Sequence, residues 1–124
     1  MYQIIFYKDE SGKSDIQEYI NELRNKKDTI KDCKIKYEKI DTYLQLLSRF
    51  GLKMGKPYIK HLVKDLWELR PLNDRIVIAH LDDNKIILLT HFVKKTRKTP
   101  KREIIKAEKL LNIIREECKN ERKF

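Results

Sequence analysis

Residues 86–102, IILLTHFVKKTRKTPKR, constrain the fold more than any other stretch of the 124-residue chain. Residues 86–90 are all apolar or β-favouring, are too few to cross a membrane, and follow a polar turn, so they predict a buried strand. The chain then carries a basic cluster with no acidic residue, formed by Lys94, Lys95, Arg97, Lys98, Lys101 and Arg102. Pro100 suits the first position of a helix. We therefore expect a strand, a basic loop and a helix in direct succession.

Length and charge limit the range of functions. A chain of 124 residues predicts one domain, 1–124. Its net charge of +10 and isoelectric point near 9.6 predict a polyanionic partner: nucleic acid first, an acidic protein second, an anionic membrane third. No window is long and apolar enough for a transmembrane helix, and residues 1–10 lack the basic leader of a signal peptide, so we expect a cytoplasmic protein without membrane contact.

Hydrophobic periodicity predicts the first half of the chain. Residues 2–7 predict a strand, and the capping-box pair Ser14 and Gln17 opens an amphipathic helix over residues 15–26. Asp28 is expected to cap a second helix that ends near Phe50, with Gly51 as its left-handed cap. Two amphipathic helices joined by a short turn predict a helical hairpin packed on a sheet.

The second half predicts a meander of strands and a final helix. Residues 66–70 alternate as a strand, and residues 75–81 predict another strand. Residues 82–85 form a hairpin turn, and the strand from Ile86 follows, whereas residues 58–63 fit a strand or an irregular segment. A helix is expected from Thr99. The sum is an α+β domain with a small antiparallel sheet, an N-terminal helical hairpin and a C-terminal helix, the helices covering mainly one face.

Several cations are expected to converge at one edge of this sheet. Arg70 ends one strand and Arg75 begins the next, while Lys94, Lys95 and Lys98 follow the neighbouring strand. Converging cations without matched carboxylates repel one another, and a bound phosphate relieves the repulsion. The alternative is ordinary ion pairing, of Arg70 with Glu68 or Asp74 and of Arg75 with Asp82. Glu68 is also a candidate partner for Arg75 or Lys94.

Two further residues invite a functional interpretation. His91 ends the buried strand beside the lysines, which suits proton transfer, although a structural role is the alternative. Trp67 alternates with Leu69 and belongs either to the core or to a surface that stacks on a base. Neither the histidines nor the cysteines have metal-ligand spacing, so we expect no metal and no cofactor.

The second half of the chain resembles the phage-derived branch of HigB-type toxins in the RelE/ParE superfamily. The resemblance extends from Leu62 to about Leu111 and rests on a "lWELR" strand, an arginine that opens the next strand, and an "LLhgFxKKtxktP..EI..A" segment. These correspond here to residues 65–70, to Arg75, and to residues 87–100 followed by Glu103, Ile104 and Ala107. Ile76 and its neighbours stand where the family often has an aromatic residue.

The resemblance implies a RelE-like fold and a metal-independent endoribonuclease, the toxin of a type II toxin–antitoxin system. Such a toxin cleaves mRNA on the ribosome, inhibits translation and growth, and is neutralised by a HigA-like helix-turn-helix antitoxin. On this basis the expected catalytic residues are Arg70, Arg75, His91, Lys94, Lys95 and Lys98. The expected contacts to mRNA and ribosomal RNA are Arg97, Lys101, Arg102, Lys106 and Trp67.

Two other functions stay open at this stage. One is a ParE-type inhibitor of DNA gyrase, which has no catalytic site and no need of convergent cations after the strand. The other is a non-enzymatic module that binds RNA or the ribosome, which the net charge of +10 permits.

Overall fold

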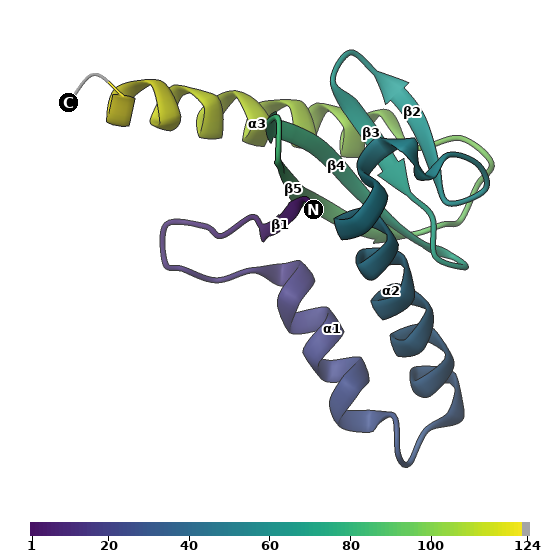
Figure 1. Cartoon of the computed structure of the whole chain (residues 1–124). Helices are drawn as coiled ribbons and strands as arrows, with labels where there is room; N and C mark the ends of the chain where they lie inside the picture. The colour runs from purple at the N-terminus through teal and green to yellow at the C-terminus, as the bar shows by residue number, and fades with distance from the viewer. Residues whose placement is uncertain (123–124) are drawn as a thin grey trace.

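A five-stranded sheet forms the centre of the computed structural model, which describes residues 1–122 (Figure 1). The elements follow in the order β1 (Gln3–Phe6), α1 (Asp15–Lys26), α2 (Lys31–Phe50), η1 (Gly51–Met54), β2 (Ile59–Val63), β3 (Leu66–Leu69), β4 (Asp74–Asp82), β5 (Lys85–Val93) and α3 (Lys101–Arg122). The spatial order of the strands is β1-β5-β4-β3-β2. The predicted α+β class, helical hairpin and meander are confirmed.

The sheet departs from the prediction in one strand. Strands β2 to β5 are antiparallel to their neighbours, as predicted, but β1 lies parallel to β5, with Gln3 opposite Lys85 and Phe6 opposite Leu88. Residues 59–63, which fitted a strand or an irregular segment, form the edge strand β2. The period-2 pattern identifies a strand but carries no information on its direction relative to a distant neighbour.

Helices cover both faces of the sheet, so the expectation that they cover mainly one face was wrong. Ile76 and Ile78 share a core with Ile16 of α1 and Leu47 of α2, whereas Val77 packs on the opposite face in a core that includes Ala107 and Leu111 of α3. Residues 74–79 and 86–90 are accordingly buried without interruption. Such continuous burial is the pattern of strands covered on both faces.

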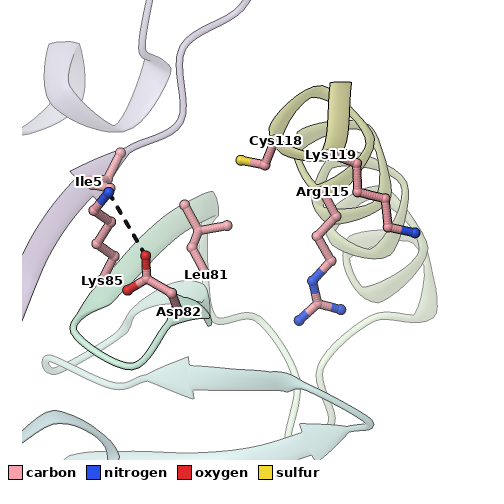
Figure 2. A pocket seen from close by; sticks show the side chains of 7 residues that line it. All are labelled: Ile5, Leu81, Asp82, Lys85, Arg115, Cys118 and Lys119. Atoms are coloured by element: carbon pink, nitrogen blue, oxygen red, sulfur yellow. Dashed lines mark ion pairs between the residues drawn. The ribbon is translucent and has the colours of Figure 1, made fainter. Parts of the chain in front are cut away.

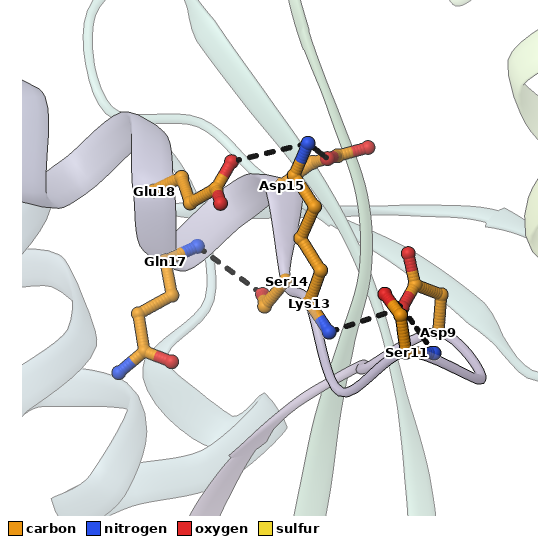
Figure 3. A network of polar contacts seen from close by, with 7 residues as sticks. All are labelled: Asp9, Ser11, Lys13, Ser14, Asp15, Gln17 and Glu18. Carbon is orange, nitrogen blue, oxygen red and sulfur yellow. Dashed lines mark hydrogen bonds and ion pairs between the residues drawn. The ribbon is translucent and has the colours of Figure 1, made fainter.

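The helical hairpin begins with a side-chain cap. Ser14 accepts a hydrogen bond from the Gln17 amide at 3.2 Å and so satisfies one of the free donors of the first turn of α1 (Figure 3). The preceding turn is held by Asp9, whose carboxylate accepts hydrogen bonds from the amides of Ser11 and Lys13 at 2.9 and 3.0 Å. The Ser11 hydroxyl also donates to this carboxylate, at 2.6 Å, and this bond, followed by the bond from the Lys13 amide, lowers the pKa of Asp9.

The second helix begins later than expected. Asp28 is not its cap: the amides of Thr29 and Ile30 donate to the carbonyl of Lys26, which continues the turn after α1, and α2 starts at Lys31. The end of α2 is as predicted, because Gly51 has φ of +60° and its amide donates to the Leu47 carbonyl. A Cβ at Gly51 would lie 2.6 Å from the Tyr2 ring, so glycine also permits this close contact.

Figure 1 shows the hairpin of α1 and α2 projecting well beyond the sheet, while α3 runs past the sheet toward the C-terminus. Within residues 1–122, no helix combines the length and apolar character that a membrane crossing requires.

Candidate functional site

A buried carboxylate, Glu68, lies between Arg70 and Arg75 and beside the loop that precedes α3. Its position on β3 opposite Val77 of β4 directs it to the face covered by α3, and only 2% of its surface is exposed. One carboxylate oxygen, Oε1, lies 3.5 Å from Arg70 Nε and 3.7 Å from Arg75 Nε. The other oxygen, Oε2, accepts a hydrogen bond from the Thr99 hydroxyl at 2.6 Å. Glu68 therefore connects two arginines to the loop that precedes α3.

The second arginine of the cluster, Arg75, is buried and holds the turn between β3 and β4. Its Nη1 donates to the carbonyls of Leu72 and Asp74 at 2.7 and 2.9 Å, and 7% of its side chain is exposed. Leu72 has φ of +55°, a conformation that residues other than glycine rarely adopt, so the bond from Arg75 to the Leu72 carbonyl helps to stabilise the turn. Burial, and then the nearby Arg70 guanidinium, lower the pKa of Arg75 below its ordinary value.

Arg70 is the more accessible of the two arginines. Its side chain is 30% exposed, and its amide donates to the Tyr58 carbonyl at 2.9 Å, which fixes the end of β3. The Nε atom of Arg70 is buried and lacks a hydrogen-bond partner within residues 1–122, although it faces Glu68. The Arg70 guanidinium is therefore partly exposed to solvent, whereas the Arg75 guanidinium is buried.

The basic loop, residues 94–99, closes over this cluster. The Lys94 amide donates to the Asn73 carbonyl at 2.7 Å, so the loop leaves β5 beside the turn that Arg75 holds. A small cavity of about 10 Å³ remains, and its lining is formed by Glu68, Arg75, Phe92, Lys94, Thr96, Arg97, Lys98 and Thr99. That volume accommodates about one water molecule and no phosphate.

The structure brings together most of the cations predicted to share an edge, and it also adds their counter-charge. Arg70, Arg75, Lys94 and Lys98 surround Glu68 or line the cavity beside it, and Arg97 joins them. Lys95 lies exposed in the same loop but does not line the cavity. The premise that no carboxylate matches these cations was wrong, because Glu68 pairs with both arginines. Arg75 does not pair with Asp82, which instead lies 3.8 Å from Lys85.

His91 lies on the opposite face of the sheet from this cluster. It is opposite Ile76 in the register of β4 and β5, stacks on the Tyr19 ring of α1 with centroids 4.2 Å apart, and is 14% exposed at its side chain. Its Nε2 lies 2.9 Å from Asp74 Oδ1, which also accepts a hydrogen bond from the Tyr19 hydroxyl at 2.8 Å. The three side chains join α1, β4 and β5.

Asp74 links the two faces of the sheet. Its carboxylate faces Tyr19 and His91, while its backbone carbonyl accepts from Arg75. Burial raises the pKa of Asp74, but the hydrogen bonds from His91 and Tyr19 outweigh burial and leave that pKa below its ordinary value. Burial, and then the bond to Asp74, raise the pKa of the Tyr19 hydroxyl. His91 thus stabilises the turn that positions Arg75.

The remaining predicted contacts are dispersed. Trp67 packs beside the core on the hairpin face and meets His61 edge to face with centroids 4.8 Å apart, so it lies across the sheet from Arg75. Lys101 and Arg102 are exposed in the first turn of α3. Lys106, one turn further, lines a separate cavity of about 130 Å³ together with Lys13 and His91.

The sequence does not reveal the contacts of three residues around the site. Thr99 is predicted only as a helix start, and Asp74 only as an ion-pair partner for Arg70. A threonine before proline gives no signal of a tertiary hydrogen bond, since the contact to Glu68 joins residues 31 positions apart. Tyr19 fits the helical period of α1, which does not indicate its hydrogen bond to Asp74. Within the described chain, no group of three His, Cys, Asp or Glu residues could hold a metal ion.

The family model described as "Phage derived protein Gp49-like" matches residues 18–112, from within α1 to within α3, and it includes β2 to β5 and the whole Glu68 cluster. No curated protein matches the chain.

Proposed function

The chain belongs to the phage-derived Gp49-like family, a family of RelE- and HigB-like toxins, and we propose that it is the toxin of a type II toxin–antitoxin system that cleaves mRNA on the ribosome. The observation that carries the proposal is the arrangement around Glu68. Two arginines pair with one buried carboxylate, and three further cations from a loop with no acidic residue line the small cavity beside it. The cluster keeps an excess of positive charge at one point of the surface.

Such a cluster suits cleavage of RNA by its own 2′-hydroxyl. The 2′-oxygen attacks the adjacent phosphorus, the bond from phosphorus to the 5′-oxygen of the next nucleotide breaks, and the products carry a 2′,3′-cyclic phosphate and a 5′-hydroxyl. Charge accumulates on the non-bridging oxygens of the pentacovalent transition state, where preorganised cations stabilise it most. Arg70 contacts the phosphate from the solvent side in this proposal, and Arg75 adds charge from beneath.

Proton transfer is assigned to the basic loop. A proton leaves the 2′-hydroxyl, and another reaches the departing 5′-oxygen. Lys94 and Lys98 line the cavity, and Lys95 lies exposed next to them. In this proposal one of these lysines accepts the proton as a neutral amine. His91 is on the other face, so the proposal gives it the task of holding Asp74 and the turn rather than moving protons.

Access of RNA to this site requires the loop to move. The cavity of about 10 Å³ is too small for a phosphate group, and the hydrogen bond between Thr99 and Glu68 holds the loop against β3. Displacing residues 94–99 opens the path to Arg75. The proposed partners are mRNA, ribosomal RNA at Lys101, Arg102 and Lys106, and a HigA-like helix-turn-helix antitoxin.

The exposed cations Lys95, Arg97 and Lys98 favour one other function, a module that binds RNA or the ribosome without cleaving RNA. In that case the cations serve only as a phosphate-binding surface, and Arg75 and Glu68 serve only to hold the turn.

The test is a cleavage assay with purified protein, translating ribosomes and a labelled mRNA. The proposed nuclease produces new RNA ends that carry cyclic phosphate, and Arg70→Ala removes them, whereas Arg24→Ala, at an exposed site of α1, leaves them unchanged. Ribosome binding without new ends in the wild-type reaction would assign the protein to the binding function instead.

A further inference from the structure

The two edges of the sheet are protected to different degrees. Edge strand β2 carries Lys60 and His61, both exposed, has a register irregularity between His61 and Val63, and ends at Lys64 with φ of +50°. Charged residues and bulges of this kind prevent an edge from pairing with other strands. Edge strand β1 has the sequence QIIF, with no charge, no proline and no irregularity in its register.

The backbone of β1 has free hydrogen-bonding groups on its outer side. Gln3 at the start of β1 donates its amide to the carbonyl of Asn84, just before β5, at 2.7 Å, and Tyr7, just after β1, donates its amide to the Leu88 carbonyl of β5 at 2.9 Å. Because successive residues of a strand point in opposite directions, Ile4 and Phe6 direct their amides and carbonyls away from β5. Tyr2, just before β1, has no free backbone groups: its amide donates to the Ser48 carbonyl of α2, and its carbonyl accepts from the Ser48 hydroxyl.

A groove lies beside β1 on the face covered by α3 (Figure 2). Its volume is about 550 Å³. Figure 2 shows Arg115, Cys118 and Lys119 of α3 across the groove from Ile5 and Leu81. The neighbouring strand residues are apolar, so the groove has an apolar floor next to the free edge.

The rim of this groove is cationic. Lys85, Arg115 and Lys119 line it, against one carboxylate, Asp82. All three cations already have exposed partners: Asp82 lies 3.8 Å from Lys85, Glu116 lies 4.0 Å from Lys119, and Asp65 lies 2.9 Å from Arg115. Exposed pairs contribute little to stability and are easily exchanged for a new partner. The groove therefore favours a partner that is both apolar and acidic.

We propose that the outer edge of β1 and this groove form a docking site for an extended, acidic segment of another protein, which adds a strand to the sheet. The segment pairs with the backbone of Ile4 and Phe6 and directs alternate apolar side chains toward Ile5, on the face of the sheet that α3 covers. Its carboxylates meet Lys85 and Lys119. A second copy of this chain is a poor occupant, because the net charge of each copy is +10. The site shares no residue with the Glu68 cluster, so it goes beyond the proposed nuclease activity.

Amide hydrogen exchange on the whole protein tests this site with a defined probe. In the free protein, the amides of Ile4 and Phe6 are expected to exchange at least about ten-fold faster than the Ile5 amide, which lies between them and faces β5. A ten-residue peptide of alternating glutamate and valine is expected to slow Ile4 and Phe6 by about ten-fold or more. The same residues arranged in two blocks, five glutamates and then five valines, provide the control peptide.

Charge variants supply the second measurement. Lys119→Glu is expected to weaken binding of the alternating peptide by about five-fold, and Lys109→Glu, an exposed site on the same helix outside the groove, is expected to leave it unchanged. Absence of protection at millimolar peptide, or equal protection by the blocked peptide, would overturn the proposal. Protection that rises with protein concentration alone would assign the edge to a second copy, and displacement of the peptide by a short RNA would assign the groove to RNA.

Discussion

Replacing Glu68 by glutamine tests whether one buried carboxylate holds the cluster together. The substitution keeps the size of the side chain and an oxygen that can accept the Thr99 hydrogen bond, but it removes the negative charge. Arg70 and Arg75, whose Nε atoms lie 3.5 and 3.7 Å from Glu68, are then left to repel each other without compensation. The protein should still fold but be less stable.

The magnitude follows from the exposure of the three side chains. Removing one partner of a fully buried ion pair costs about 3–5 kcal/mol. Glu68 is 3% exposed and Arg75 is 7% exposed at the side chain, which argues for a cost in this range. Arg70 is 30% exposed and regains water, and Arg75 keeps its two backbone carbonyls, which both reduce the cost. We expect Glu68→Gln to lower the free energy of unfolding by about 2–4 kcal/mol.

Urea denaturation measures this change, with Glu22→Gln as the matched control. Glu22 also forms an ion pair, with Lys26 at 2.7 Å, but its side chain is 61% exposed, so its substitution should cost little stability. Inorganic phosphate should raise the urea midpoint of Glu68→Gln more than that of the wild type, because the unpaired arginines then bind the anion. The role of Glu68 would be refuted if Glu68→Gln and Glu22→Gln lowered the free energy of unfolding by amounts that agree within about 0.5 kcal/mol.

Three further predictions concern the residues around this cluster. Thr99→Val removes the hydrogen bond to Glu68, so it should lower the free energy of unfolding by about 1–3 kcal/mol and speed tryptic cleavage after Lys94, Lys95, Arg97 or Lys98. The control is Thr96→Val, which should cost less because the Thr96 hydroxyl donates only to the exposed Lys98 carbonyl. Equal cleavage rates in the two variants would contradict this role of Thr99. Asp74→Asn should change the pH dependence of stability. The pKa of Asp74 is depressed in the folded protein, so the stability that its carboxylate contributes is complete above the ordinary pKa of 3.8 and is lost as pH falls through the lower folded pKa. Urea midpoints measured across that acid range should therefore fall less for the variant than for the wild type. Tyr19→Phe leaves Asp74 with one donor fewer and should lower the free energy of unfolding by about 1 kcal/mol in the same assay, with no loss expected if the hydroxyl is unimportant.

The local elements were predictable because their signals are local. Ser14 with Gln17 identified the start of α1, Gly51 identified the end of α2, and the alternation of residues 66–70 identified β3. The start of α2 was missed because Asp28 matches a cap by residue type, whereas the turn that continues from Lys26 decides where the helix begins. A residue type indicates that a cap is possible but does not show which backbone amides are left free.

The site was predictable in part. The meander order brought Arg75 beside the loop of Lys94 and Lys98, as reasoning from the sequence expected. The same reasoning did not separate the two faces of the sheet, so it grouped His91 with the arginines. An irregularity in the pairing of β4 and β5 lies between Val77 and Ile78, where Thr90 and Leu88 are the partners and Leu89 is left over. One extra residue reverses the face of every side chain beyond it, which sequence alternation alone does not reveal.

The most direct test of the proposed nuclease is primer extension on a translated mRNA after brief induction of the protein in growing cells. Wild type, Arg70→Ala, Lys95→Ala and the exposed-site control Arg24→Ala are compared at equal protein levels. The proposal predicts new cleavage ends and growth arrest with wild type and Arg24→Ala, and neither with Arg70→Ala. Lys95→Ala shows whether the exposed lysine of the loop takes part. Growth arrest without new ends in the wild type would contradict RNA cleavage and favour a protein that acts by binding alone.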